Sequence, residues 1–486
     1  MIELDRTSAV GLADQIAAAL MGLIERGELL GGARLPSVRQ MAKRLSVSPF
    51  TVIAAYDKLV AKNSLVARHG SGYYVAARNQ LMELSEIEST QGNPSEAVGF
   101  TLQSLDAGHT AIKAGSGFLP QQWLAEVVPP ALVSRVARAQ FALTLPAPAQ
   151  GLTGLRRQLA ERLQGWGVAA VAGQVVTTLG ASHAFDLIVR SVLQPGDTVA
   201  VEDPGYLVLL SQLKSHGLRL VAIPRLADGP DLDALEEAAR LHKPKLFFTQ
   251  TLLHNPTGTS TSAARCHKLL LMAERLDFRI VEDDALGDLA ADGVTRLAAL
   301  DELRRVFYVG SFTKLLSPAL RVGYVAVPRD CVDKLVEEKI LSVLGTPSFT
   351  ERVVEEVLAS GRYQRHTKQV RSQLRRFRQR AHAMLQGAGV EIARPVSEGL
   401  FIWGRVPGLE APDELVKRAL GEGILLAKGS MFSPTGSHAD FLRFNAAHCC
   451  EARLADFLRS ALTPRQPAPV ARLPRPASQP VSARTS

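Results

Sequence analysis

The feature that most constrains the fold is a regular alternation of short apolar runs with longer segments of helical periodicity. Seven of these runs are rich in β-branched residues, and they are Gln174–Thr178, Thr198–Glu202, Leu218–Pro224, Leu246–Thr251, Phe278–Asp283, Val306–Gly310 and Val322–Val327. This rhythm predicts an α/β fold whose mostly parallel, seven-stranded sheet carries helices on both faces. Because ligands bind at the carboxyl ends of the strands in such sheets, the residues that follow each strand are the first candidates for a functional site.

The composition is that of a globular protein large enough for more than one domain. The chain has 486 residues, of which 46% are hydrophobic and 21% charged, so it can form a substantial core. Its four cysteines have no metal-ligand spacing and fit a reducing compartment. The first residues lack the pattern of a signal peptide, and no stretch is apolar enough to cross a bilayer. We therefore expect a cytoplasmic protein without a metal or a membrane partner.

Changes in composition divide the chain into four parts. A polar stretch over Arg78–Thr110 indicates an interdomain linker, and the proline-rich segment from Thr463 onward indicates a disordered tail. We predict a first domain at 1–77, a linker at 78–113, a second domain at 114–462 and a basic tail at 463–486. The formal net charge of +9 lies mainly at the two ends of the chain. Such a charge is compatible with phosphate binding but does not by itself establish a nucleic-acid partner.

The first domain has the pattern of three helices followed by a hairpin. A helix is predicted over 10–27, a second over Val38–Leu45 and a third from Ser48, a favourable N-cap that is followed by proline. Two short strands, Leu65–Ala67 and Tyr73–Val75, would pair across a glycine-containing turn. This layout is typical of winged helix-turn-helix domains, in which the third helix enters the major groove of DNA. A small helical domain that binds protein is the alternative interpretation.

Several segments of this domain resemble the winged helix of the GntR family. The matching residues, in chain order, are Arg34–Ala42, Leu45–Ser48, Thr51-Val52, Ala55-Tyr56 and Gly70–Gly72. The resemblance implies that double-stranded DNA is a partner. It also implies DNA-contacting roles for Arg34, Arg39, Ser48 and Thr51, and a wing-shaping role for Gly72. Pro49 stands where the family usually has arginine, so one expected DNA contact is absent.

Chemically useful side chains follow the predicted strands of the second domain. Gly180 precedes a predicted helix, Ala184–Leu193, and such a turn lets backbone N–H groups bind phosphate. Later strand ends carry Asn255-Pro256-Thr257-Gly258, Glu282-Asp283-Asp284 and Gly310–Lys314, with Arg321 close behind. A lysine can form a Schiff base with an aldehyde, an acid can keep a pyridine nitrogen protonated, and arginine and hydroxyl groups can bind phosphate. Each motif alone could be a turn or a surface group, but together they predict a site for an aromatic aldehyde phosphate.

This set of motifs resembles fold-type I aminotransferases over about Ala114–Leu462, which implies pyridoxal 5′-phosphate (PLP) as the cofactor. The resemblance gives catalytic roles to Lys314, which would bind PLP covalently, and to Asp283, which would hold the pyridine nitrogen. It places Asn255 on the ring oxygen, Tyr206 near the cofactor and Arg443 on the carboxylate of a substrate or effector. The implied phosphate ligands are Ala181, Ser182, Ser311, Thr313 and Arg321.

The second domain departs from that family directly after Asp283. These enzymes usually have a tyrosine two or three residues later, which donates a hydrogen bond to the ring oxygen, whereas this chain has Ala285 and Leu286. Asn255 would then hold that oxygen alone. We therefore predict a raised pKa for the Schiff base between Lys314 and PLP, with slow or absent transaminase turnover.

A GntR-type head joined to an aminotransferase-like domain resembles the MocR subfamily of transcription regulators. The resemblance implies a homodimer, with each head resting on the large domain of the partner, that binds operator DNA and senses an amine, an amino acid or PLP itself. One alternative is a functional PLP-dependent aminotransferase with secondary DNA binding, and another is a large domain reduced to a cofactor-free dimerisation scaffold. The sequence does not name the effector, the operator, the target genes or the sign of regulation.

Overall fold

The computed structural model describes residues 4–6, 10–25, 29, 32–62, 64–68, 72–75, 96–106, 112–139, 147–392 and 398–462. The chain divides into two compact units, Met1–Asn93 and Pro94–Ser486. The predicted tail, the tip of the predicted wing at 69–71 and most of the predicted linker lie outside the described residues. In the part that is described, no helix combines the length and the apolar character needed to span a membrane.

The first unit is a winged helix-turn-helix. Its elements are α1 (Leu12–Glu25), α2 (Val38–Leu45), α3 (Pro49–Ala61), β1 (Leu65–Arg68) and β2 (Gly72–Val75). The α2 bounds are those predicted, because Ser37 and Gln40 form a capping box at its start. The first helix begins at Leu12 rather than at residue 10, since the carbonyl of Gly11 accepts the first helical hydrogen bonds.

One apolar core holds these elements together. It contains residues from α1, α2 and α3 and from both strands of the hairpin, including Ile16, Leu20, Met41, Val52, Ala55, Leu59, Leu65 and Val75. The strands β1 and β2 pair antiparallel, with Leu65 opposite Val75. Burial of this set fixes α3 by one face only, and its opposite face remains exposed.

The second unit is built on an eight-stranded sheet, in the order β3-β10-β9-β8-β7-β4-β5-β6. The strands are β3 (Val175–Thr178), β4 (Thr198–Asp203), β5 (Arg219–Leu226), β6 (Gly229–Pro230), β7 (Leu246–Thr249), β8 (Arg279–Asp283), β9 (Val306–Ser311) and β10 (Gly323–Ala326). All seven predicted runs form strands, but the predicted number of seven was wrong. The eighth strand, β6, consists of one glycine and one proline paired antiparallel with β5, and neither residue carries a strand signal.

The sheet is mostly parallel, as predicted. Strands β5, β4, β7, β8 and β9 pair parallel in that order, while β10 runs antiparallel between β9 and β3. The carboxyl ends of the parallel strands therefore lie at one edge, where Asp203, Thr249, Asp283 and Ser311 are the last residues of β4, β7, β8 and β9. This edge is the expected position of a ligand crevice.

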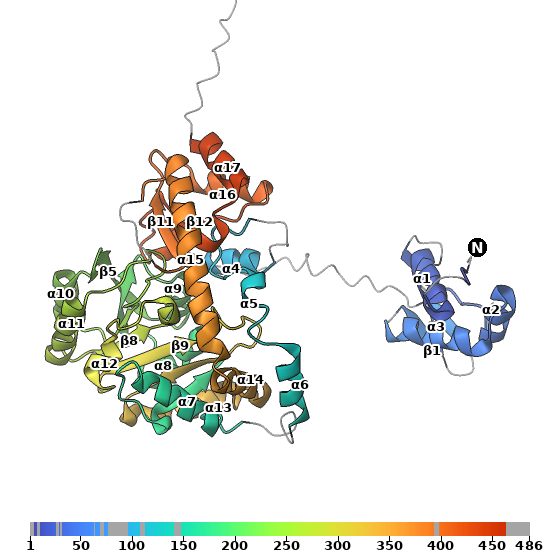
Figure 1. Ribbon diagram of the computed structural model, residues 1–486, viewed down its shortest axis with the longest axis horizontal. Coiled ribbons are helices and arrows are strands. Elements are labelled where there is room, and N and C mark those ends of the chain that lie inside the picture. Colours follow the sequence, from blue (N-terminus) through green and yellow to red (C-terminus); the bar gives the residue numbers. More distant parts are fainter. Residues whose placement is uncertain are drawn as a thin grey trace, which may run out of the picture. The chain divides into compact units, whose positions relative to one another are not determined.

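Helices cover both faces of the large sheet (Figure 1). Ile280 and Val281, neighbours on β8, belong to two different apolar clusters. Val281 shares its cluster with residues of α8 (Ala181–Val192), α9 (Leu207–Ser215) and α13 (Val332–Val343). Ile280 packs in the larger cluster, whose helices include α7 (Thr153–Gln164), α10 (Leu232–His242), α11 (Ala263–Arg275), α12 (Leu297–Asp301) and α14 (Ser348–Ala359).

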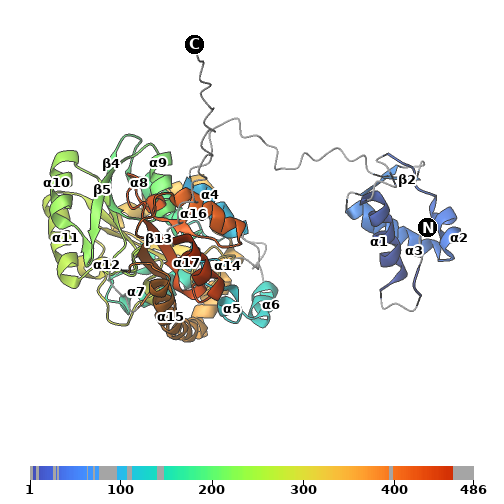
Figure 2. The same ribbon diagram turned by 90° about the horizontal axis from the view of Figure 1, so that it is seen from above.

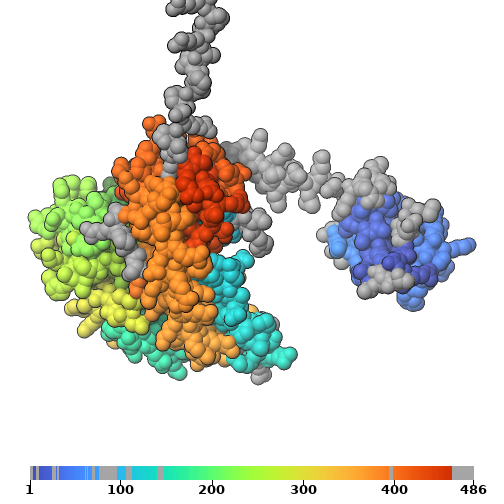
Figure 3. Space-filling model, turned by 45° about the horizontal axis from the view of Figure 1, so that its top comes forward, coloured from blue at the N-terminus to red at the C-terminus, as the bar shows by residue number. Residues whose placement is uncertain are grey.

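A smaller antiparallel sheet follows in the chain and was not predicted. It has the order β11-β13-β12, formed by β11 (Phe401–Arg405), β12 (Ala427–Lys428) and β13 (Phe441–Asn445), and it is accompanied by α16 (Pro412–Gly421) and α17 (Ala452–Leu462). The 26-residue helix α15 (Arg362–Gly387) runs from the large sheet to this smaller part (Figures 1 and 2). Its outer side forms part of the surface of the second unit (Figure 3).

Three further helices precede the large sheet: α4 (Glu96–Asp106), α5 (Gln121–Leu124) and α6 (Pro130–Arg138). Helix α4 lies inside the range predicted as linker, so that part of the prediction was wrong. Ala97 and Phe100 of α4 are buried in one cluster with Leu207 and Leu425. The spacing of Val98, Leu102 and Leu105 is helical, and it is the sequence signal by which this helix could have been recognised.

Candidate functional site

In the first unit, the residues proposed to bind DNA lie around α2 and the start of α3. Arg34, Arg39 and Ser48 are exposed. The Ser48 hydroxyl accepts a hydrogen bond from the backbone N–H of Thr51 at 3.1 Å and lies 2.8 Å from the Thr51 hydroxyl. Ser48 and Thr51 therefore act first as the N-cap of α3, and this fixes the orientation of the helix terminus.

Gly72 has the conformation that a wing requires. Its φ of +106° is unfavourable for other residues. A Cβ at this position would lie 3.8 Å from Nε of Arg34. Arg34 also pairs through its backbone with Tyr74 of β2, so the structure brings this arginine to the base of the hairpin.

In the second unit, a phosphate-binding cradle forms where β3 enters α8. Gly180 has a φ of +85°, and α8 begins directly after it at Ala181 rather than at the predicted Ala184. The backbone N–H groups of Ala181 and Ser182 therefore belong to the first helical turn, where donors are free. A Cβ at position 180 would lie 3.0 Å from Nη2 of Arg321 and 3.2 Å from Oγ1 of Thr313, so these two side chains border the same space.

The hydroxyl groups of this cradle differ in their hydrogen bonding. The Ser311 hydroxyl accepts from the backbone N–H of Thr313 at 3.2 Å. The Thr313 hydroxyl is buried and has no hydrogen-bond partner among the described residues. Arg321 donates through Nη2 to the carbonyl of Leu179 at 2.8 Å, which holds the guanidinium beside the cradle. A buried hydroxyl without a partner is costly, and a bound phosphate oxygen would satisfy it.

Lys314 and Asp283 face the same buried space. Burial and the nearby charge of Arg443 lower the pKa of Lys314 to about 8, while Asp283 acts in the opposite direction. Burial raises the pKa of Asp283 to about 7, against a hydrogen bond from the backbone N–H of Ala285. The Lys314 amine lies 4.2 Å from the centroid of the Phe118 ring. The amine can therefore lose its proton near neutral pH, and a cationic partner would stabilise the charged form of the buried carboxyl group.

Asn255 and Arg443 are joined by a hydrogen bond from Nη1 of Arg443 to Oδ1 of Asn255 at 2.9 Å. Arg443 is only 2% exposed and lies between the rings of Phe401 and Phe432. Its Nη2 donates to the carbonyl of Gly115, and burial lowers its pKa to about 9. Arg443 is thus a buried cation at the site and not a surface base.

Tyr206 lies three residues after the end of β4, at the start of α9. Burial and the nearby Asp283 carboxylate raise the pKa of Tyr206, whereas a hydrogen bond with Ser182 opposes the change. Tyr206 and Asp283 also line a small cavity of about 20 Å³, whose other walls are mostly apolar. The phenol therefore stays protonated and can donate a hydrogen bond.

The sequence places Gly115–Trp123 among the segments that line the distal end of the ligand, but it assigns no role to any single residue at 115–118. Asn445 of β13 donates through Nδ2 to the carbonyls of Ser116 and Phe118, at 2.9 and 2.7 Å, and this places Gly117 and Phe118 beside Lys314. No local motif marks these residues. Their role follows from a contact with a strand more than 300 positions away.

The position where a related enzyme would have tyrosine is occupied by the apolar core. Leu286 is 3% exposed and packs in the larger cluster. Asp284, which follows Asp283 in the chain, accepts hydrogen bonds from Nε of Arg296 at 2.8 Å and from the hydroxyl of Tyr308. Tyr206, by contrast, is a phenol whose pKa the Asp283 carboxylate raises.

These residues fit PLP. An amine that loses its proton near neutral pH, a buried acid, and a cradle with an unpartnered hydroxyl match the aldehyde, the ring nitrogen and the phosphate of this molecule. The Asn255 amide and Arg443 add groups for an oxygen and a carboxylate. Within the described ranges no group of His, Cys, Asp and Glu side chains could hold a metal ion.

Comparison with known proteins agrees with the geometry of both units. Residues 111–460 match the family of class I and II aminotransferases, and residues 12–75 match the gntR family of bacterial regulatory proteins. An uncharacterized HTH-type transcriptional regulator of Bacillus subtilis, YdfD, is 28% identical over 448 residues, which cover 89% of this chain and 92% of the relative. The 2-aminoadipate transaminase of Thermus thermophilus is 31% identical over 67% of this chain and 83% of its own length.

Among solved structures, the second unit is similar to LysN, the α-aminoadipate aminotransferase of Thermus thermophilus, in complex with N-(5′-phosphopyridoxyl)-L-leucine. The TM-score is 0.69 at 27% identity, and the match covers 76% of this chain and 97% of LysN. The chain therefore belongs to the aminotransferase class I and II family of PLP-dependent proteins and, through its gntR-type head, is a transcription regulator of the MocR type.

Proposed function

We propose that this regulator senses a small molecule with a primary amine and a carboxylate, through PLP bound covalently to Lys314. The single observation that carries the proposal is the buried hydrogen bond between Arg443 and Asn255. A buried guanidinium favours an anionic ligand, and here it lies beside the amide that we assign to the cofactor ring. An α-amino acid has both a primary amine that can react with PLP and a carboxylate that can bind Arg443. It therefore fits the site better than a simple amine or PLP alone.

The proposed roles divide the site into a phosphate end and a ring end. The first turn of α8, at Ala181 and Ser182, binds the phosphate together with Ser311, Thr313 and Arg321. Asp283 holds a proton at the pyridine nitrogen, Asn255 donates to the ring oxygen, and Tyr206 lies beside the ring. When bound, PLP supplies an aldehyde carbon that reacts with amines, and Lys314 is the amine that holds it in the resting state.

We further propose that turnover is slow. The phenol that usually stabilises the ring oxygen after Asp283 is replaced by the buried Leu286, so less hydrogen bonding supports the ring during a reaction. Transamination with secondary DNA binding is the second candidate function, because Lys314 and Asp283 are both in place and the 2-aminoadipate transaminase is 31% identical. A cofactor-free scaffold is disfavoured by the fit of the site to PLP.

The effector must change the affinity for DNA through geometry. A ligand shifts an equilibrium only when it binds one of two arrangements more tightly. We propose that the protein is a homodimer and that the ligand favours one arrangement of its heads. The linker and both units would then belong to one switch.

A spectral screen of amino compounds against the purified holoprotein tests this function, with operator binding followed in parallel. We expect one or a few amino acids to change the absorbance of the cofactor and the affinity for DNA at the same concentration. Lys314→Ala should lose both responses while it remains folded. Steady turnover of amino-acid and keto-acid pairs, without an effect on DNA binding, would instead support the second candidate.

A further inference from the structure

The exposed face of α3 carries an apolar patch of Phe50, Ile53 and Ala54. Phe50 is 82% exposed, more than any other large hydrophobic side chain in the described residues, and Ile53 is 37% exposed. Neither side chain belongs to the core of the first unit. Phe50 therefore contributes little to folding, and a contiguous exposed apolar group of this kind indicates a binding surface.

This patch lies at the start of the helix expected to read DNA. Ser48 is the N-cap of α3 and Pro49 its first residue, so Phe50 lies in the first turn. Val52, Ala55 and Leu59 are buried on the opposite side. In helix-turn-helix proteins the N-terminal residues of the second helix of the motif contact the base edges in the major groove.

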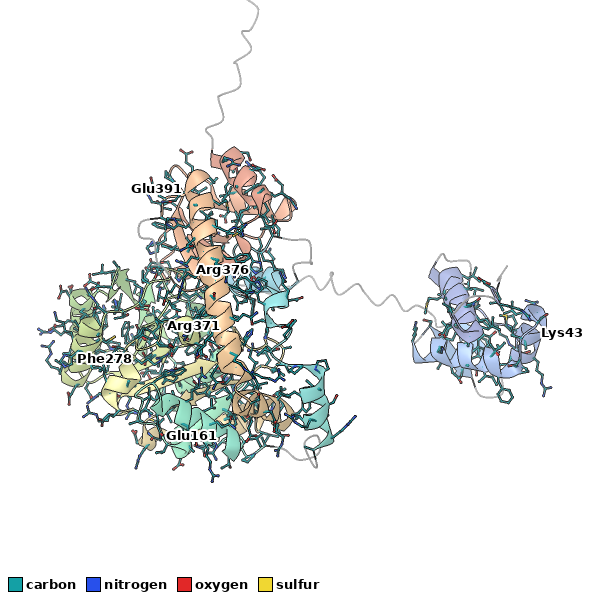
Figure 4. All side chains as sticks on the ribbon, in the orientation of Figure 1. Lys43, Glu161, Phe278, Arg371, Arg376 and Glu391 are labelled. Carbon is teal, nitrogen blue, oxygen red and sulfur yellow. The ribbon has the colours of Figure 1, made fainter. Side chains whose placement is uncertain are left out.

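The charges around the patch favour a polyanionic partner. Arg39, Lys43 and Arg44 of α2 are exposed, and the side chain of Lys43 projects away from the ribbon of its unit (Figure 4). Asp57 is the acidic residue on the exposed face of α3, one turn beyond Ile53. Lys58 forms an ion pair with Asp14 at 2.5 Å. An exposed apolar patch on α3, together with exposed cations on α2 of the same small unit, fits duplex DNA, whose phosphates flank the groove.

The residues on this face limit what α3 can read. Between Pro49 and Asp57 there is no arginine, lysine, asparagine or glutamine, so the side chains that bind guanine or adenine through two hydrogen bonds are missing. The apolar group on the major-groove edge of the bases is the C5 methyl of thymine. Since the chain has bulky apolar side chains where polar readers are expected, its sequence preference should follow the thymine methyl groups.

We propose that Phe50, with Ile53 beside it, contacts thymine methyl groups in the major groove and thereby determines the operator specificity of the protein. This inference rests on the operator-binding function of the head. Pro49 removes the arginine contact that is usual in the GntR family. The apolar contact of Phe50, one residue further along α3, takes its place.

The experiment starts from duplexes that the full-length holoprotein selects from a random pool. Each thymine of a selected duplex is replaced by deoxyuridine, which lacks only the methyl group. We expect one or two positions in each half-site at which the loss of one methyl group lowers the affinity about fourfold. This factor corresponds to the free energy of burying one methyl group away from water. At those positions a C·G pair should weaken binding and a 5-methylcytosine·G pair should restore part of the loss.

Variants assign the effect to Phe50. Phe50→Ala should bind the selected duplex more weakly and should no longer distinguish thymine from deoxyuridine. Leu241→Ala, which truncates a 70% exposed leucine on α10 of the second unit, is the matched control and should retain the full distinction. The deoxyuridine scan on the wild-type protein tests the proposal even if the Phe50 variant loses all DNA binding.

Three results would overturn the inference. The protein could select a duplex but tolerate deoxyuridine at every position. The thymine methyl groups would then not be recognised, although the operator-binding function would still stand. The same holds if Phe50→Ala keeps the wild-type methyl dependence. If no duplex is recovered and Phe50→Ala alters the stability of the assembled protein, the patch binds protein instead, and the operator-binding function fails with the inference.

Discussion

Arg443 donates a hydrogen bond from Nη1 to Oδ1 of Asn255 over 2.9 Å, and both side chains are buried. The two residues lie on opposite parts of the second unit, one on β13 of the small sheet and the other after β7 of the large sheet. A carboxylate that binds Arg443 competes for the same guanidinium. The amide assigned to the cofactor ring is therefore coupled directly to the group assigned to the ligand.

This coupling predicts a selective defect in Arg443→Lys. A lysine keeps the charge but cannot form two parallel hydrogen bonds, so we expect the affinity for amino acids to fall by roughly 2 kcal/mol, about thirtyfold. An amine that lacks the carboxylate should bind almost as before. Titration of the cofactor absorbance with each member of an amino acid and amine pair measures both affinities. Equal losses for the two ligands would contradict a carboxylate-binding role.

A second prediction compares two lysines whose pKa values are lowered by a similar amount. Burial lowers the pKa of both Lys314 and Lys339 to about 8. Lys339, however, donates to the hydroxyls of Thr177 and Thr346, at 3.1 and 3.2 Å, and has no phosphate cradle beside it. Reduction of the holoprotein with borohydride followed by peptide mapping should therefore label Lys314 alone. Labelling at Lys339 would show that a low pKa, and not the cradle, selects the site. Labelling at neither lysine would show that no covalent link forms.

The lowered pKa of Lys314 also predicts the pH dependence of cofactor capture. The free amine is the nucleophile, so the rate at which apoprotein takes up PLP should rise with pH and level off above about pH 8 rather than near 10.5. The lowered pKa also means that burying the charged amine lowers the free energy of unfolding. This destabilisation is fully present below about pH 8, the pKa in the folded state, and is lost above 10.5, the ordinary pKa of the unfolded chain. Stopped-flow absorbance measures the rate.

Asp283→Asn provides the control for this profile. The Asp283 carboxylate raises the pKa of Lys314, so its removal should move the inflection to lower pH. The substitution should also remove any second inflection near pH 7, where Asp283 itself titrates. An unchanged profile would mean that the two groups do not share one site.

Local signals explain which parts of the fold could be predicted. The bounds of α2 follow from the capping box of Ser37 and Gln40, a pattern contained within four residues. The start of α8 was placed three residues too late, because the positive φ of Gly180 allows the helix to begin immediately after it. β6 carries no strand pattern, and its position depends on pairing with β5. α4 has helical spacing of its apolar residues, but it lies in a stretch whose polar composition indicates a linker, and its position depends on packing near Leu207.

In the candidate site, too, the residues of local motifs could be predicted, whereas the contacts between distant segments could not. Motifs at strand ends indicated Asp283, Asn255 and Lys314, since the residues of each motif are neighbours in the chain. The hydrogen bond of Asn255 to Arg443 spans 188 positions, and the approach of Phe118 to Lys314 spans nearly 200. Contacts of this kind join segments that are far apart in the chain and have no signature in the sequence.

Leu286 predicts the titration behaviour of the cofactor. We expect the wild-type pKa of the visible absorbance to lie above that of a typical transaminase, because no phenol follows Asp283. Leu286→Tyr should lower this pKa by about one unit, the effect of one hydrogen bond to a charged group. Leu286→Phe introduces the same ring at the same buried position without the hydroxyl, and it should leave the pKa unchanged. A shift of the same size in both variants would assign the effect to packing.

The last prediction concerns the salt dependence of DNA binding by the head. Arg39 is exposed in the first turn of α2, and Arg34 lies at the base of the wing. If each binds one phosphate, alanine at either position should weaken all duplexes to a similar extent and reduce the slope of log affinity against log salt by about 1. Lys58→Ala is the matched control, because this lysine is also exposed but is paired with Asp14, and its slope should remain that of the wild type. Fluorescence anisotropy at several salt concentrations measures the slope. A slope that Arg39→Ala leaves unchanged would remove Arg39 from the DNA interface, since each phosphate contact that forms releases condensed counterions from the DNA and so contributes to the slope.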